Sequence, residues 1–92
     1  MQKRRRRYPR ARADVRFQPG AGGLSLHDAQ GVRANPLSFI AAVVLTYCDG
    51  RHPPELIAEN VAGLANSRSD AEELRAEVRR IIQDFAEAGL VN

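Results

Sequence analysis

The chain has 92 residues, of which 43% are hydrophobic and 27% are charged. A domain of this size buries only about 60–65% of its unfolded surface, which leaves little room for a large substrate cavity. The composition is that of a globular protein. A single cysteine, Cys48, excludes an intrachain disulfide and fits a reducing, cytoplasmic compartment.

Charge is divided unevenly along the chain, although the net charge is only +3. Residues 1–17 hold eight Lys or Arg and one Asp, whereas residues 18–92 hold six basic and ten acidic residues. This asymmetry predicts a basic, flexible arm at residues 1–13 and an acidic domain at residues 14–92. The basic run at residues 3–7 suits attraction to nucleic acid, anionic lipid or an acidic protein, or is a solvated tail. It lacks the apolar stretch of a signal peptide.

Extended segments are expected first. Apolar and polar residues alternate at 15–18 and again at 24–27, which is the period of a strand. Residues 19–23 are rich in glycine and predict a turn or flexible loop between them. Residues 32–37 form a third extended segment. Pro36 cannot donate a hydrogen bond, so this segment should lie at the edge of a sheet.

The first helix is expected within residues 34–48, which carry no charge. Ser38 is suited to cap its N-terminus, and Asp49-Gly50 is suited to end it. Apolar side chains point in nearly every direction, so the helix should be buried on all sides, in the core or against a second chain in a homodimer. The uncharged run is too short to span a membrane.

Two more helices should follow. The second is expected to begin at Pro53-Pro54, and the third at the capping box Ser69-Asp70-Ala71-Glu72 and to end at Gly89. The predicted class is α+β and winged-helix-like, with a short three-stranded antiparallel sheet followed by three helices. A DNA-binding version would present the start of the third helix, but residues 70–77 hold four acids and one base, which makes DNA an unfavourable partner.

The third helix combines a core face with two flanks of opposite charge. At about 100° per residue, four apolar residues fall together: Leu74, Val78, Ile81 and Phe85. Arg75 and Arg79 lie on one flank beside Ile82. The other flank holds Glu73, Glu77 and Asp84. Intrahelical ion pairs explain this pattern, or else the basic flank borders a groove for an acidic, partly apolar peptide.

Catalytic and metal-binding patterns are missing from the sequence. The two histidines, His27 and His52, and the single Cys48 have no spacing typical of a zinc or haem site. His27 has no predictable nucleophile nearby. The glycines at 20–23 are not followed by the helix of a phosphate-binding loop. We therefore expect a protein that is not an enzyme and needs no metal or cofactor.

Two parts of the chain resemble the PqqD family, the peptide chaperones of pyrroloquinoline quinone (PQQ) biosynthesis. One is residues 43–51 with residues 54–59, around Asp49-Gly50, and the other is the ending at 82–91. The resemblance covers about residues 15–92. It implies a non-catalytic domain that binds the leader of a ribosomally made, PqqA-like precursor peptide and presents it to a PqqE-like radical S-adenosylmethionine maturase.

The resemblance also implies where the leader binds. In such domains the leader adds as an antiparallel strand to the sheet edge and lies against the third helix. Carried onto this sequence, the edge is Val32, Arg33, Ala34 and Asn35. The helical lining is Arg75, Val78, Arg79 and Ile82. A winged-helix DNA-binding protein and a homodimeric scaffold built on the first helix are the alternatives.

Overall fold

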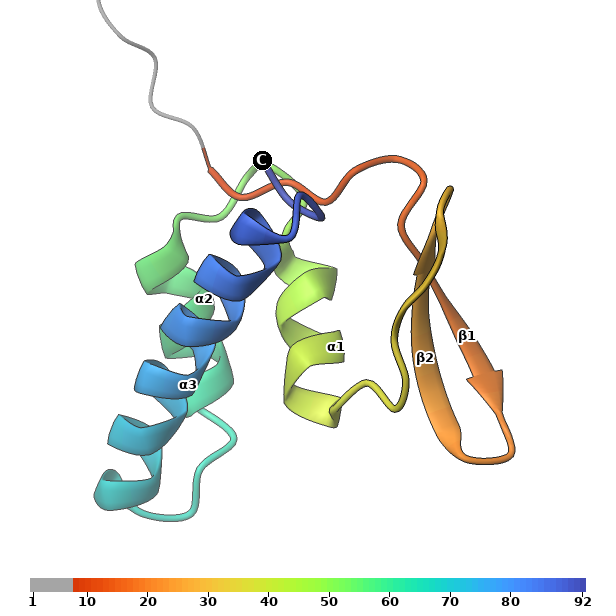
Figure 1. The fold of residues 1–92 in the computed structure, drawn as a ribbon. Helices are drawn as coiled ribbons and strands as arrows, with labels where there is room; N and C mark the ends of the chain where they lie inside the picture. The colour runs from red at the N-terminus through yellow and green to blue at the C-terminus, as the bar shows by residue number, and fades with distance from the viewer. Residues whose placement is uncertain (1–7) are drawn as a thin grey trace, which may run out of the picture.

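The computed structural model describes residues 8–92, and the basic run at residues 3–7 lies outside the described residues. Three strands come first and three helices follow, with the sheet standing beside the helices (Figure 1). The elements are β1 (Arg16–Gly20), β2 (Gly23–Asp28), β3 (Gly31–Ala34), α1 (Phe39–Tyr47), α2 (Pro54–Ala62) and α3 (Arg68–Glu87). The predicted α+β class is confirmed.

The sheet is antiparallel in the order β1-β2-β3, so β3 is an edge strand, as the proline after it predicts. β1 is longer than expected, because Pro19 and Gly20 still pair with the start of β2. The turn predicted within residues 19–23 is therefore present but shorter than expected, because it consists of Ala21-Gly22 alone and no flexible loop separates the two strands. Gly23 follows with φ of 111°, a conformation that favours glycine. Pro19 is tolerated because β1 is the other edge.

A bulge interrupts the pairing of β3 with β2. His27 pairs with Val32 and Leu26 pairs with Ala34, which leaves Arg33 as one extra residue. Side chains of a regular strand alternate between faces, but the extra residue lets Arg33 and Ala34 both reach the helical side. Ala34 packs against the core there, whereas Val32 is 58% exposed.

α1 and α2 begin where the sequence predicts. The Ser38 hydroxyl accepts a hydrogen bond from the N–H of Ala41 at 3.1 Å, and Pro53 precedes α2. Gly50 follows α1 with φ of 84°. Burial of α1 on all sides is not found, because Phe39 is 70% exposed. The homodimer through α1 stays a prediction.

α3 begins two residues earlier than predicted. Its N-cap is Ser67, whose hydroxyl accepts from the N–H of Asp70 at 3.1 Å. The sequence Ser67-x-x-Asp70 has the same capping pattern as Ser69-x-x-Glu72, and the earlier of the two overlapping signals is used. Gly89, with φ of 78°, follows the helix end as expected.

One apolar core joins the helices to the inner face of the sheet. Its largest fully buried apolar side chains are Leu26, Val44, Ile57, Val61 and Val78. Each stabilises the fold by about 1.5–3 kcal/mol relative to an exposed position. Leu90 and Val91 return onto this core, as predicted. In the part of the chain that the structure describes, no helix combines the length and apolar character needed to cross a membrane.

The segment before β1 is held against the helical layer. The N–H of Ala11 donates to the carbonyl of Cys48 at 2.8 Å, and the N–H of Arg12 donates to that of Leu90 at 3.0 Å. The N–H of Gly50 donates to the carbonyl of Pro9 at 2.9 Å. Backbone contacts of the domain thus begin before residue 14, in a segment that the charge pattern assigns to the arm.

We predict that Cys48 reacts slowly in the folded protein. Its side chain is 4% exposed, and burial, together with the neighbouring Asp49 carboxylate, raises the pKa of its thiol to about 11. Little thiolate is then present near neutral pH, and the thiolate is the reactive form. Labelling with iodoacetamide, followed by mass spectrometry, should be fast in urea and slow in buffer. Equal rates in the two solutions would contradict burial of the thiol.

Candidate functional site

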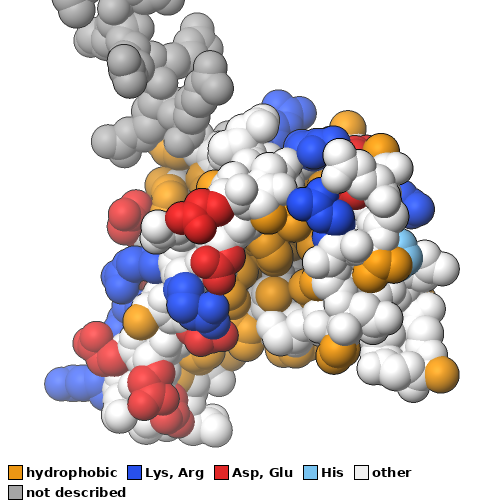
Figure 2. Space-filling model, viewed as in Figure 1, with side chains coloured by type: hydrophobic (Ala, Val, Ile, Leu, Met, Phe, Trp, Pro, Cys, Tyr) orange, Lys and Arg blue, Asp and Glu red, His pale blue; other side chains and the backbone are white. Residues whose placement is uncertain are grey.

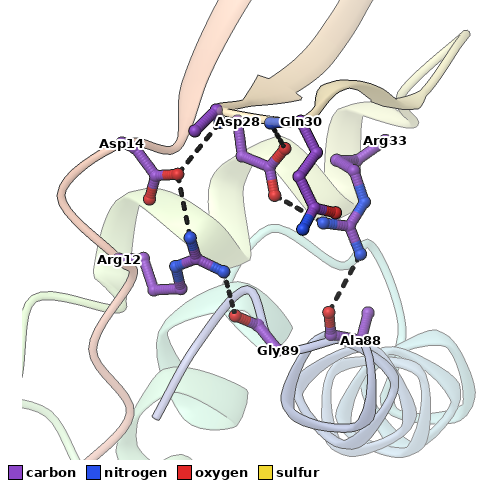
Figure 3. A network of polar contacts seen from close by, with 8 residues as sticks. Arg12, Asp14, Asp28, Gln30, Arg33, Ala88 and Gly89 are labelled. Atoms are coloured by element: carbon purple, nitrogen blue, oxygen red, sulfur yellow. Dashed lines mark hydrogen bonds and ion pairs between the residues drawn. The ribbon is translucent and has the colours of Figure 1, made fainter.

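A buried ion pair joins the sheet to the end of α3 (Figure 3). The Asp28 side chain is fully buried and is paired with the Arg33 guanidinium. Asp28 also accepts from the N–H of Gln30 at 2.8 Å. Arg33 Nη2 donates to the carbonyl of Ala88 at 3.0 Å. One side chain on the β3 bulge therefore connects β2, β3 and the C-terminal end of α3.

Arg12 makes a second contact of this kind from the segment before β1 (Figure 3). It pairs with Asp14 at 2.9 Å and donates to the carbonyl of Gly89 at 3.3 Å. Asp14 accepts from the N–H of Ala29 at 2.9 Å, and this bond and Arg12 lower the pKa of the Asp14 carboxyl. The last carbonyl groups of a helix carry partial negative charge, so guanidinium groups there stabilise α3.

Figure 2 shows a furrow between the helices and the sheet, with apolar side chains along its base and acidic side chains on its helical border. No Cα of the three strands lies within 8 Å of a Cα of the three helices. We define the acidic flank of α3 as Asp70, Glu73, Glu77 and Asp84. At about 100° per residue, Ala88 lies on the same side of α3 as this flank. Arg33 of β3 reaches the Ala88 carbonyl, and three members of this flank share a cavity with Ile40 of α1, so the acidic flank borders the furrow.

A cavity of about 400 Å³ opens where α1 and α3 begin, at the opposite end of the furrow from the Arg33 contact. Its lining comes from α1, from the loop between α2 and α3, and from α3. The lining residues are Ile40, Leu64, Ala65, Asn66, Asp70, Glu73, Leu74 and Glu77. The cavity therefore combines apolar walls with three carboxylates and no basic side chain.

The edge residues predicted to bind a peptide have different environments. Val32 lies on the outer face of the sheet, and Asn35 is exposed just after β3. Ala34 is half-buried on the helical side. Arg33 is engaged with Asp28 and Ala88. The edge strand exists as predicted, but the Arg33 guanidinium already bonds to groups of the domain itself.

The predicted helical lining does not face the furrow. Arg75 donates from Nε to Oε2 of Glu59 on α2 at 2.8 Å, and this hydrogen bond raises the pKa of the guanidinium. Arg79 and Ile82 share this flank, which is turned toward α2. Val78 is 0% exposed in the core. The border of the furrow is therefore acidic, whereas the sequence suggested a basic border. Glu59 on α2 is the acidic partner of Arg75, and this pairing turns the basic flank toward α2.

The outer face of the sheet holds a Ser–His pair that the sequence pattern did not indicate. Ser25 Oγ lies 2.9 Å from Nε2 of His27, because residues two apart in a strand share a face. Ser25 also donates to the carbonyl of Gln18 at 3.1 Å. Among residues 8–92 no carboxylate orients the other ring nitrogen, and neither residue lines the cavity. The pair thus lacks the parts of a catalytic triad.

Metal binding finds no support in the described part of the chain. Among residues 8–92, no three His, Cys, Asp or Glu side chains lie close enough together to hold an ion. His52 Nδ1 lies 2.9 Å from Asp49 Oδ1. This hydrogen bond lowers the pKa of Asp49, and a weaker lowering comes from the hydrogen bond that the N–H of Arg51 donates. These contacts order the loop between α1 and α2.

Comparison with solved structures finds a similar fold. The structure is similar to that of lasso peptide synthetase B1 complexed with the leader peptide, with a TM-score of 0.66 over 91% of this chain and 96% of that chain. The two sequences are 16% identical, so the likeness establishes the fold. No protein-family model matches the sequence, and no curated protein matches it. Membership of the PqqD family stays a prediction.

We predict that replacing Arg33 with Met destabilises the domain by about 3 kcal/mol, because the buried Asp28 carboxylate loses its partner. Arg12→Met is the control. It breaks an exposed pair and should cost less than about 1 kcal/mol. Urea unfolding followed by circular dichroism measures both variants. Equal, small losses would show that the Arg33 contact does not hold the sheet on the helices.

The Asp14 carboxylate leads to a prediction about how the stability of the domain changes in acid. The pKa of Asp14 is lowered in the folded state, so its stabilising contribution is present above the unfolded value of about 4. It is lost as the pH falls through the lower, folded pKa. Asp14→Asn should therefore reduce stability at neutral pH and flatten its decline below about pH 4. Urea midpoints across this range measure the effect, and an unchanged slope would contradict it.

Proposed function

We propose that this chain is a non-catalytic leader-recognition domain. It binds the leader of a ribosomally made precursor peptide along the edge of β3 and in the furrow beside α3. The observation that carries the proposal is an edge strand bordering a partly apolar furrow, in a fold similar to one determined with a leader peptide bound.

The edge strand supplies the means of binding. An extended peptide that adds to a sheet edge gains main-chain hydrogen bonds, and alternate side chains enter pockets that set specificity. β3 is short, and its bulge and the proline two residues after its end limit the number of regular ladder bonds. The cavity beside Ile40 and Leu74 must therefore supply much of the specificity.

Presentation to a modifying enzyme is the finer part of the proposal. A bound leader holds the rest of the precursor near an enzyme that docks on the same domain, and this raises its effective concentration. The PqqD resemblance favours a radical S-adenosylmethionine maturase in the synthesis of PQQ or a related peptide product. The similar solved structure is that of lasso peptide synthetase B1 complexed with the leader peptide, and it supports leader binding rather than this choice of maturase.

Titration of the ¹⁵N-labelled domain with candidate leaders, encoded in reading frames beside its own, tests the proposal directly. We expect saturable shifts of backbone amides in β3 and along the acidic flank of α3. Duplex DNA serves as the comparison ligand. Absence of shifts with every leader, or shifts produced by DNA alone, would overturn the proposal.

Ile40→Glu should weaken leader binding by more than about tenfold, because it places a charge in the apolar wall of the cavity. Phe39→Glu is the matched control. Phe39 is the neighbouring residue, is 70% exposed and does not line the cavity. Calorimetry measures the affinities, and thermal unfolding verifies that both variants fold. Equal affinities of the two variants would exclude the cavity from the binding site.

A further inference from the structure

The cavity in the furrow has one type of charge. Asp70, Glu73 and Glu77 lie among its lining residues, and no Lys or Arg does. Glu77 is paired with Arg80 at 2.9 Å. Asp70 and Glu73 make no ion pair within residues 8–92. Two carboxylates at the rim of the cavity are thus available to a ligand of positive charge.

The acidic flank continues this charge toward the other end of the furrow. Asp84 lies two turns beyond Glu77 on the same side of α3, and Arg80 bonds to both, at 3.1 Å and 2.9 Å. Four carboxylates therefore share one guanidinium along this border. Along the border formed by α3 a negatively charged ligand would be repelled, whereas a positively charged ligand would be attracted; Arg33, at the other end of the furrow, is already paired with Asp28.

The base of the cavity adds an apolar requirement. Ile40 and Leu74 are half-buried on its walls, and Leu64 is 58% exposed at its edge. The cavity volume of about 400 Å³ accommodates a large aliphatic or aromatic side chain. In an extended peptide, residues two positions apart point the same way. A long basic side chain two positions from the apolar one can keep its stem on apolar surface while its charge reaches the carboxylates.

We propose that the domain selects leaders in which a large apolar residue is followed or preceded, two positions away, by Lys or Arg. This inference rests on the proposed function and names the chemical class of its ligand. The apolar residue enters the cavity beside Ile40, and the basic residue pairs with Glu73 and Asp70. The ligand is thus basic and apolar, in contrast to the acidic peptide that the flank pattern of α3 suggested.

Synthetic peptides of one length test the selection. In each peptide every second residue lies on one face, and along that face Leu alternates with a test residue. The test residue is Lys in the first peptide, Gln in the second and Glu in the third. At low ionic strength, calorimetry should show that the Lys peptide binds at least about tenfold more tightly than the Glu peptide, and that added salt reduces the difference. Amide shifts should map the Lys peptide to the acidic flank.

Charge reversal supplies the decisive variant. Asp70→Lys/Glu73→Lys should reverse the order of the Lys and Glu peptides. Glu55→Lys/Glu72→Lys changes the net charge equally, outside the cavity lining, and should keep the order. Glu73 lies beyond the first turn of α3. The single variant Glu73→Lys should therefore reduce the preference for the Lys peptide over the Glu peptide even if the double variant unfolds.

The outcomes separate this inference from the proposed function. If the Gln peptide binds in the furrow as tightly as the Lys peptide, the charge selection is wrong and leader binding stands. If neither the peptides nor any leader binds, both fail. Self-association of the free protein that the double reversal abolishes would identify a second copy as the occupant and overturn the inference.

Discussion

The pairing of Arg33 with Asp28 is the interaction on which the arrangement of sheet and helices depends. The strands keep their backbones away from the helices, so side chains must span the space between the two layers. A buried ion pair adds little net stability over an apolar replacement, but it is costly to break and accepts few alternative geometries. Arg33 also holds the carbonyl of Ala88, which sets the distance between β3 and the end of α3. At this end of the furrow, the width follows from the reach of one guanidinium.

The bulge in β3 makes that contact possible and affects the binding edge as well. Without an extra residue, Arg33 and Ala34 would lie on opposite faces, and either the ion pair or the contact of Ala34 with the core would be lost. The same distortion leaves a short, irregular edge. An added strand can form only a few regular hydrogen bonds there, so side-chain contacts in the furrow carry more of the discrimination between peptides.

Local patterns in the sequence predicted most of the fold. Period-2 alternation located the strands, the serine before α1 and the prolines before α2 located two helix starts, and the third-helix face containing Val78 proved to be core. The bulge was not predictable, because it depends on pairing between strands. The sequence also did not predict which charged flank of α3 faces the sheet, because that too depends on contacts between elements. Periodicity gives angles around a helix axis, and only the position of α2, marked by the Arg75–Glu59 pair, decides which flank faces the sheet.

The orientation of α3 also changes what the charge of the chain implies. The net charge of +3 suggests a protein that repels basic ligands. At physiological ionic strength, however, charges are screened beyond about 8 Å, so a ligand in the furrow interacts chiefly with the groups that line it. Along α3 the charged groups are four carboxylates and Arg80, and Arg33 at the far end of the furrow is already paired with Asp28. The local field therefore has the opposite sign to the net charge, and it is the local field that selects the ligand.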